Sequence, residues 1–500
     1  MNTAIKSLAA LALAMLLAGC ASMRGLAPSA NIADANTLRA EKSLVGTHLT
    51  PAAWPQSDWW KTLNDPQLNA LMEEALAGSP TLRIAEARVK SALGFAQSTN
   101  AAQFPQINGD AAVTRERFPE RGLVPPPFAG AWATQAQLQA TLGYEADLWG
   151  RNRAAYLGAI GEARAAEIDA FAARLALSVN VVQAYVQFHR AFLQLDVAQK
   201  NLREREQLFD LTRQRFEGGL DTRLAVKQAE SAVPGAREQI AQLDEAIDLA
   251  RHQLAALAGQ GPDRGLALQR PTVNAAMQAE LPAAVPAELI GRRPDLVAQR
   301  WRVEAAAKNI DVAKADFYPN VNLSAFIGLQ TIGLSGFFQA GNATYGLGPA
   351  VTLPIFDAGR LRGNLAQRNA GYDVAVEQYN QTLVDAMRDV VDQLTSMKSV
   401  ETQRKDQALS EAAAQEAYDL AMQRYREGIG NYLEVLTAEN QLLTQQSIGV
   451  DLRARELSLS VNLTRALGGG FEPVRMPTSQ VHDEQVPAKK SSWLARLFGG

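Results

Sequence analysis

The 500-residue chain has a single cysteine, Cys20, and only four histidines. One cysteine can form no disulfide bond within the chain, so the stability of the fold must come from side-chain packing. The 49 basic and 52 acidic residues leave a net charge of −3. This balance argues against a nucleic-acid partner, because such a partner requires a concentrated basic surface.

Motifs of catalytic and cofactor sites are also absent from the sequence. No two histidines have the spacing of a metal site such as HExxH, and there is no Walker A motif, no GxSxG and no strand-associated GxGxxG. His189 and His252 fall in long helical segments and are interpreted as surface or packing residues. The sequence therefore predicts no enzyme, no metal site and no cofactor.

Long apolar runs are missing too. Beyond the first 20 residues no run of 18 apolar residues occurs, so no transmembrane helix is expected. Residues 1–19 are predicted to be a signal peptide, with Lys6, an apolar stretch over 8–17 and small residues before Cys20. The alternative interpretation is an ordinary secretory cleavage site beside an incidental cysteine.

The segment Leu17-Ala-Gly-Cys20 resembles the bacterial lipoprotein signal. In that signal the cysteine thiol carries a diacylglycerol, with palmitate, and becomes the mature N-terminus. Ala21, and not aspartate, follows Cys20. By the same resemblance, this points to a lipid-anchored protein of the outer membrane.

The sequence is internally duplicated. Pro80 recurs as Pro294, 214 residues later, and Gly150 recurs as Gly359, 209 residues later. A period of about 210 residues is too long for a solenoid repeat and indicates a duplicated half-domain. The predicted organisation is a signal peptide (1–19), a lipidated N-terminal arm (20–60), a first repeat (61–270), a second repeat (271–470) and a flexible C-terminal tail (471–500).

Each repeat contains two segments with the alternation of a β-strand. The predicted strands are 106–117, 135–148, 320–328 and 345–353. Their polar positions hold mainly amides and small residues, which suits a water-filled lumen, and no further strands are available to cover the apolar face. Membrane hairpins are therefore favoured over two hairpins of a soluble sandwich.

Each strand pair precedes a proline-free segment, 152–217 in the first repeat and 361–427 in the second. At 1.5 Å per residue, a helix of this length extends about 100 Å. Apolar residues every seven positions, such as Val181 and Phe188, predict supercoiled helices. Glycine-containing turns at 215–220 and 424–430 then reverse the chain into returning helices.

Four strands are too few to close a barrel, because small membrane barrels start at about eight strands. Open sheet edges are not tolerated in lipid, so copies of the chain must combine. Two copies would give eight strands with a filled interior, whereas three would give a 12-stranded barrel with a water-filled bore. The predicted fold class is therefore mainly α with a membrane β-barrel, as a homotrimer whose barrel continues into a periplasmic α-helical tunnel.

Several motifs resemble those of the outer-membrane factors of bacterial tripartite efflux pumps, the TolC/OprM-like channels, and in particular their NodT-type lipoprotein branch. The matching stretches are VPAELIGRRPDL (285–296), ADFYPNVNLSA (315–325), GPAVTLPIFDAGRLRGNL (348–365) and the two tip turns. The resemblance implies a homotrimeric, passive exit duct for small molecules such as drugs. It also implies docking to a periplasmic adaptor (membrane-fusion) protein and an inner-membrane pump of the resistance-nodulation-division (RND) type.

The same resemblance assigns roles to residues at the two tip turns. Tyr425 occupies the position of a periplasmic gate tyrosine, and Glu434 that of an acidic constriction residue. Ala225 stands at the corresponding position of the first repeat, where relatives often carry an acid. The residues implied in adaptor docking are Arg215, Gly219, Leu220, Arg424, Gly428 and Ile429.

Three other functions are compatible with parts of this sequence. A channel for type I protein secretion would have the same architecture, although the lipid anchor favours small-molecule efflux. A periplasmic adaptor lipoprotein would have one helical hairpin and a split lipoyl-like β domain. A coiled-coil scaffold of the envelope would need no strands with a polar face.

Overall fold

The structure is a computed structural model that describes residues 22–38, 54–273 and 291–472. Cys20, the predicted signal peptide and nearly all of the predicted C-terminal tail lie outside the described residues. The predictions made for those segments therefore stay predictions.

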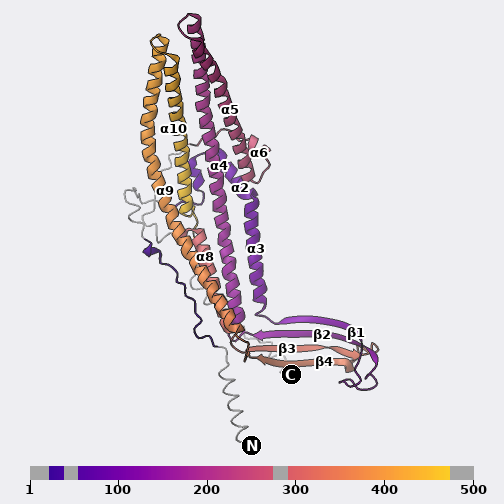
Figure 1. The fold of residues 1–500 in the computed structure, drawn as a ribbon. Coiled ribbons are helices and arrows are strands. Elements are labelled where there is room, and N and C mark those ends of the chain that lie inside the picture. The colour runs from indigo at the N-terminus through magenta and orange to yellow at the C-terminus, as the bar shows by residue number, and fades with distance from the viewer. Residues whose placement is uncertain (1–21, 39–53, 274–290, 473–500) are drawn as a thin grey trace.

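The described chain contains two successive runs of elements in the same order (Figure 1). The first run is α3 (Pro80–Ala101), β1 (Gln106–Arg117), β2 (Trp132–Ala146), α4 (Arg151–Glu217) and α5 (Arg223–Leu257). The second run is α8 (Pro294–Ala315), β3 (Asn320–Ile332), β4 (Ala343–Thr352), α9 (Arg360–Arg426) and α10 (Tyr432–Ala466). The shorter elements are η1 (Ala35–Thr37), η2 (Trp59–Leu63), α2 (Pro66–Gly78), α6 (Asp263–Leu266) and η3 (Ala340–Asn342).

The predicted duplication is confirmed by the lengths of the helices. α3 and α8 each have 22 residues, α4 and α9 each have 67, and α5 and α10 each have 35. Both long helices begin directly after a glycine with positive φ, Gly150 at 72° and Gly359 at 90°. These glycines turn the chain from a strand into a helix, a conformation that other residues adopt only with strain.

The four strands form one antiparallel sheet in the order β1-β2-β3-β4. The strand register brings the apolar positions of neighbouring strands to one face: Leu138 pairs with Ala111 and Leu329, and Ile327 pairs with Tyr345. The opposite face carries mainly polar and small residues, including Gln139, Thr141 and Ser324. The two-faced hairpins predicted from the sequence are therefore present.

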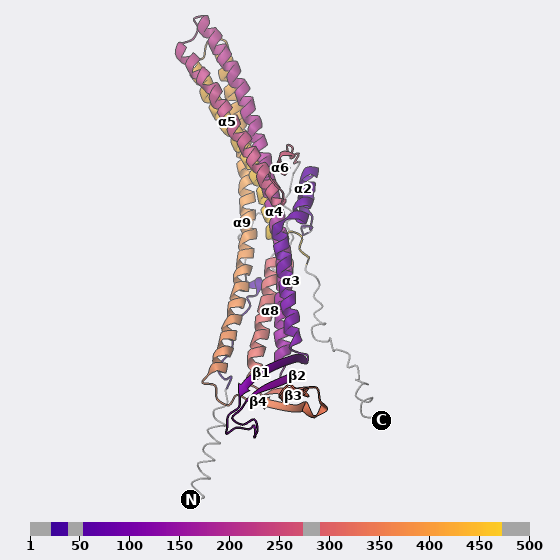
Figure 2. The same cartoon turned by 90° about the vertical axis from the view of Figure 1, so that its right-hand side faces the viewer.

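Helices and sheet lie at opposite ends of an elongated molecule (Figures 1 and 2). α4 pairs with α5 and α9 pairs with α10 as antiparallel hairpins, and α4 also contacts α10. The tips of both hairpins lie at the end farthest from the sheet. A periplasmic adaptor was predicted to have one helical hairpin and a split lipoyl-like β domain. The described chain has two hairpins and one four-stranded sheet.

Most positions of the predicted seven-residue pattern point into the helical core. Val181, Phe188, Val376 and Leu383 are fully buried, and Tyr425 continues the pattern at the tip. Phe216, the last position of the pattern in α4, is exposed instead. Among the described residues, no helix combines the length and the hydropathy needed to cross a membrane.

Residues 22–38 run along the second repeat and pack against α8 and α9. The carboxylate of Asp373 accepts hydrogen bonds from the backbone N–H groups of Ser29 and Ala30, both at 2.9 Å. The amide of Asn380 accepts one from the backbone N–H of Ala33 at 2.8 Å. Because Arg164 and Phe171 stand at the corresponding positions of α4, 209 residues earlier, the first repeat offers no equivalent acceptors.

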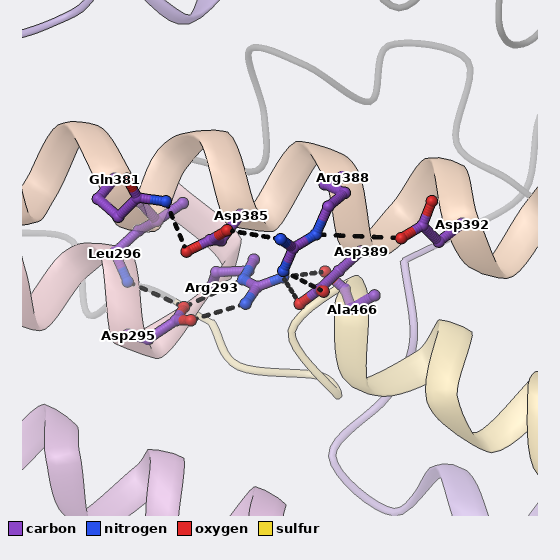
Figure 3. A network of polar contacts seen from close by, with 9 residues as sticks. All are labelled: Arg293, Asp295, Leu296, Gln381, Asp385, Arg388, Asp389, Asp392 and Ala466. Carbon is purple, nitrogen blue, oxygen red and sulfur yellow. Dashed lines mark hydrogen bonds and ion pairs between the residues drawn. The ribbon is translucent and has the colours of Figure 1, made fainter.

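Arg293 joins three helices at the start of the second repeat (Figure 3). Its guanidinium donates to both carboxylate oxygens of Asp295, at 3.1 and 2.7 Å, and to the carbonyl of Ala466, the last residue of α10, at 3.4 Å. A carboxylate oxygen of Asp389 on α9 lies 3.5 Å away. Burial alone would lower the pKa of Arg293, but the two carboxylates outweigh it and raise that pKa. The charged side chain therefore ties α8, α9 and α10 together.

We expect Arg293→Ala to lower the free energy of unfolding by about 2 kcal/mol, because it removes the charged hydrogen bonds that link α8, α9 and α10. Arg388 provides a matched control, since its side chain is 62% exposed, against 11% for Arg293, and contacts Asp385 and Asp389. Arg388→Ala should cost about 1 kcal/mol or less. Denaturant unfolding of the purified protein measures both values, and equal losses would contradict the assignment.

Candidate functional site

The two hairpin tips share one turn geometry. In the first tip the N–H of Leu220 donates to the carbonyl of Arg215 at 2.7 Å, and in the second the N–H of Ile429 donates to that of Arg424 at 3.0 Å. These are the bonds of a Schellman turn, which requires a residue with positive φ just after the helix. Gly219 at 73° and Gly428 at 85° fill that position. Glycine is needed at both tips because other residues are strained there.

The turns expose apolar side chains at the end of the molecule. Leu220 is 69% exposed and Ile429 is 66% exposed. Leu224 and Leu433, one helical turn further along, are exposed to a similar degree. Leu224 and Leu433 were not predicted to be site residues, because an apolar residue in the first turn of a helix is usually interpreted as a core residue. Each tip therefore carries a pair of apolar side chains, and the pairs are 209 residues apart.

A polar latch joins the two tips. The hydroxyl of Tyr425 on α9 donates to Asp221 Oδ2 at 2.6 Å and lies 2.9 Å from the hydroxyl oxygen of Thr212 on α4. Arg215 Nη1 donates to the carbonyl of Tyr425 at 2.8 Å, and its guanidinium carbon lies 4.6 Å from the centre of the tyrosine ring. We call these four residues, Thr212, Arg215, Asp221 and Tyr425, the latch.

The latch is buried and its tyrosine is neutral. Burial, together with the hydrogen bond to Asp221, raises the pKa of Tyr425 to about 12. At neutral pH the hydroxyl therefore keeps its proton and donates it to the carboxylate. Hydrogen bonds with one charged partner are about twice as strong as those between neutral groups. Separation of the two tips would have to break this bond.

The predicted site residues thus fall into two groups. Gly219, Leu220, Gly428 and Ile429 lie at the exposed tips, and Arg424 is also exposed. The Arg215 side chain instead turns inward, where it contacts Asp221 and Tyr425. Tyr425 is fully buried, so its contact is with the neighbouring tip of the same chain.

Glu434 caps the returning helix α10. Its backbone N–H donates to the side chain of Asn431, and the Asn431 side chain donates back to the Glu434 carboxylate, both at 3.0 Å. The pair caps the helix, although the Glu434 carboxylate binds the side chain of Asn431 and not its backbone N–H, as it would in a capping box. In the first repeat Thr222 accepts from the N–H of Ala225 at 3.2 Å, but alanine has no side chain to complete the pair. The difference between Ala225 and Glu434 is therefore also a difference in helix capping.

Thr212 and Asp221 are latch residues that the sequence did not reveal. Asp221 precedes the helix-capping Thr222 and looks like a turn residue, and it lies 204 positions before Tyr425. Nothing in a single sequence indicates this pairing. Within residues 22–38, 54–273 and 291–472, no group of three or more His, Cys, Asp and Glu residues is placed to hold a metal ion.

Comparisons with known proteins agree with this architecture. The family model described as "Outer membrane efflux protein" matches residues 71–260 and 285–469. The fusaric acid resistance protein FusA of Burkholderia cepacia is 44% identical over 370 residues, which cover 73% of this chain and 69% of FusA. The multidrug resistance outer membrane protein MdtP of Escherichia coli K12 is 30% identical over 467 residues, covering 91% of this chain and 94% of MdtP.

A solved structure extends the likeness to the fold. The outer membrane protein VceC of Vibrio cholerae superposes with a TM-score of 0.79 at 38% sequence identity. The match covers 84% of this chain and 100% of the VceC chain.

Proposed function

Because the chain belongs to the outer membrane efflux protein family, we propose that it is the outer-membrane channel of a tripartite efflux pump, a passive exit duct for small molecules such as drugs. The observation that carries this function is the two-faced sheet, with an apolar face suited to lipid and a mainly polar face suited to a water-filled lumen. The names of FusA and MdtP concern resistance to small molecules, which supports efflux over type I protein secretion.

The channel is a homotrimer. A four-stranded sheet has two open edges, β1 and β4, and three copies joined at these edges give 12 strands. The internal duplication predicts how helices of neighbouring chains pack. Because α4 of the first repeat contacts α10 of the second within one chain, we expect α9 of one chain to contact α5 of the next in the same way. Ile84 and Phe95 on α3 are exposed apolar side chains that a neighbouring copy would cover.

A diacylglycerol and palmitate on Cys20 anchor the chain to the outer membrane. The support is the path of residues 22–38, since Arg362, at the start of α9 and beside the sheet, donates hydrogen bonds to the carbonyls of Ser22 and Arg24. Mass spectrometry of the mature N-terminal peptide should find the lipid, and Cys20→Ala should remove it. An unacylated Cys20 would disprove the anchor.

The partners are a periplasmic adaptor protein and an inner-membrane RND pump. The exposed tips support this assignment, because a trimer presents six tips of the same turn geometry, three with Leu220 and three with Ile429, to the hairpins of an adaptor. In the trimer three copies of Glu434 lie around the axis at the periplasmic end, where a ring of carboxylates favours cations.

Conductance in planar bilayers tests the function. The purified protein should form pores that select cations, and Glu434→Gln should shift the reversal potential toward zero. The helix cap is preserved in this variant, because glutamine keeps the backbone N–H that donates to Asn431 and a side-chain oxygen that accepts from it. Asn431→Ala is the matched control, since it removes the cap and keeps the charge. Absence of pores would refute the channel, and an unchanged reversal potential in Glu434→Gln would refute the ring.

A further inference from the structure

A basic cavity lies between the start of α4 and the end of α8, where both helices meet the sheet. Its volume is about 350 Å³, and its walls include side chains from one face of each helix. The residues that matter here are Trp149, Arg153, Lys308, Lys314 and Tyr318. The cavity is formed by one chain alone, so it does not depend on assembly.

The cavity opens on the apolar side of the sheet. Arg151 Nε lies 2.8 Å from Asp316, and its Nη1 lies 3.8 Å from Glu145, which belongs to the polar face of β2. In an α-helix, residues two apart point about 200° away from one another. Arg153 therefore lies opposite Arg151, and Lys314 opposite Asp316. If the polar face lines the lumen, as the proposed function requires, the cavity faces the membrane.

The level of the cavity corresponds to the periplasmic edge of the membrane. Arg362, which holds the carbonyl of Ser22, is the counterpart of Arg153 in the second repeat, 209 residues later. Ser22 is two residues from Cys20, the predicted lipid-bearing residue. If Cys20 bears the lipid, as proposed above, Arg153 lies near the height of the chain's own lipid anchor.

The side chains around the cavity have the chemistry of a lipid headgroup site. Trp149 stacks on Tyr318, with ring centres 4.7 Å apart and an angle of 20° between the planes, and its indole N–H donates to the carbonyl of Pro319 at 2.7 Å. Tryptophan and tyrosine concentrate at membrane interfaces because they are apolar with one polar group. This fixed pair forms part of the cavity wall.

The charges are unbalanced in favour of cations. Lys308 Nζ lies 3.3 Å from Asp311, whereas no ion pair of the Arg153 or Lys314 side chain is found among the described residues. Three basic side chains against one carboxylate leave two positive charges at the cavity. Basic pockets beside membrane-spanning segments bind anionic lipid headgroups through their phosphates.

We propose that this cavity binds the phosphate headgroup of an anionic phospholipid from the inner leaflet, with Arg153 and Lys314 as its phosphate ligands. The site lies where α4 of the first repeat meets α8 of the second, and the duplicated positions lack its charged and aromatic side chains. In α3, the counterpart of α8, Gly94 and Asn100 occupy the positions of Lys308 and Lys314. After β4, Ala358 occupies the position that Trp149 has after β2. One lipid per chain is therefore expected, and three per trimer.

Native mass spectrometry of the full-length protein, titrated with phosphatidylglycerol or phosphatidylethanolamine, tests the proposal. We expect one phosphatidylglycerol per chain, bound about tenfold more tightly than phosphatidylethanolamine. The two lipids share the phosphate, but the ammonium group of phosphatidylethanolamine cancels its charge and is repelled by the cations of the cavity, at a cost on the order of 1 kcal/mol. The double variant Arg153→Gln/Lys314→Gln should lose that preference. Lys314→Arg should keep it, and so should the control Lys227→Gln/Lys405→Gln, whose lysines lie on α5 and α9.

Equal binding of the two lipids, unchanged binding by the double variant, or two phosphatidylglycerol molecules per chain would overturn the proposal. Conductance separates this failure from failure of the channel function. A lipid site without pores would refute the channel alone, and pores without lipid preference would refute the site alone.

Discussion

Replacing both Leu220 and Ile429 by aspartate is expected to abolish efflux while the trimer still assembles. Each side chain projects from a Schellman turn, and each contributes about 1.5–3 kcal/mol when it is buried by a partner. A carboxylate at the same position must instead be desolvated in the contact, which adds to the loss. Because three chains present six tips, the losses accumulate over the whole ring of contacts.

Drug susceptibility of cells that carry only the variant gene measures this effect, together with cross-linking of the tips to the adaptor. Leu266→Asp is the matched control, since Leu266 is 60% exposed on the short helix α6, away from the tips. The control should export normally. If the tip variant conferred the same resistance as the wild type, the docking surface would have to lie elsewhere.

Removal of the Tyr425 hydroxyl should favour the open state of the periplasmic end. Tyr425→Phe deletes the hydrogen bond to Asp221 and keeps the ring beside Arg215. A hydrogen bond to a charged group is worth about 1.5–3 kcal/mol, which corresponds to a shift of about 10- to 150-fold in the equilibrium between latched and separated tips. Single-channel recordings should show a higher open probability, and cells should become permeable to large hydrophilic antibiotics.

Tyr432→Phe controls for the loss of a tyrosine hydroxyl near the same place. The Tyr432 ring packs edge-on against Tyr425, with centres 6.5 Å apart, and its hydroxyl makes no hydrogen bond within the described part of the chain. Combining Tyr425→Phe with Asp221→Asn should give less than the sum of the two single effects, because both remove one interaction. Additive effects would show that the two residues act independently.

The latch shows where prediction from one sequence ends. The long helices were predicted to within about a residue, because glycine turns and the absence of proline set their ends. The pairing of Tyr425 with Asp221 could not be predicted, since it depends on how two hairpins cross in space. The family resemblance implied that Arg215 is a docking residue, and this stays a prediction; its side chain turns inward to Asp221, a contact that the sequence did not reveal.

The sheet shows the same contrast on a smaller scale. Alternation predicted all four strands and both faces, but it placed the end of β3 at Gly328, whereas the strand continues to Ile332. Gly328 is an interior position where β2 approaches closely: a Cβ atom there would lie 2.3 Å from the carbonyl oxygen of Leu138. A glycine that looks like a strand end can therefore mark a close contact between strands.

The path of residues 22–38 was not predicted beyond an extended arm. Its binding depends on Asp373 and Asn380, which are unremarkable polar residues on a long helix when read in sequence. Only the comparison of the two repeats in the structure explains why the arm lies on α9 and not on α4.

The central claim is that one chain has too few strands to enclose a pore, so that three chains must share one barrel. The mass of the detergent-purified, full-length protein tests it most directly, by native mass spectrometry of the pore-forming fraction. The account predicts an assembly of three chains. A pore-forming fraction made of single chains would contradict it.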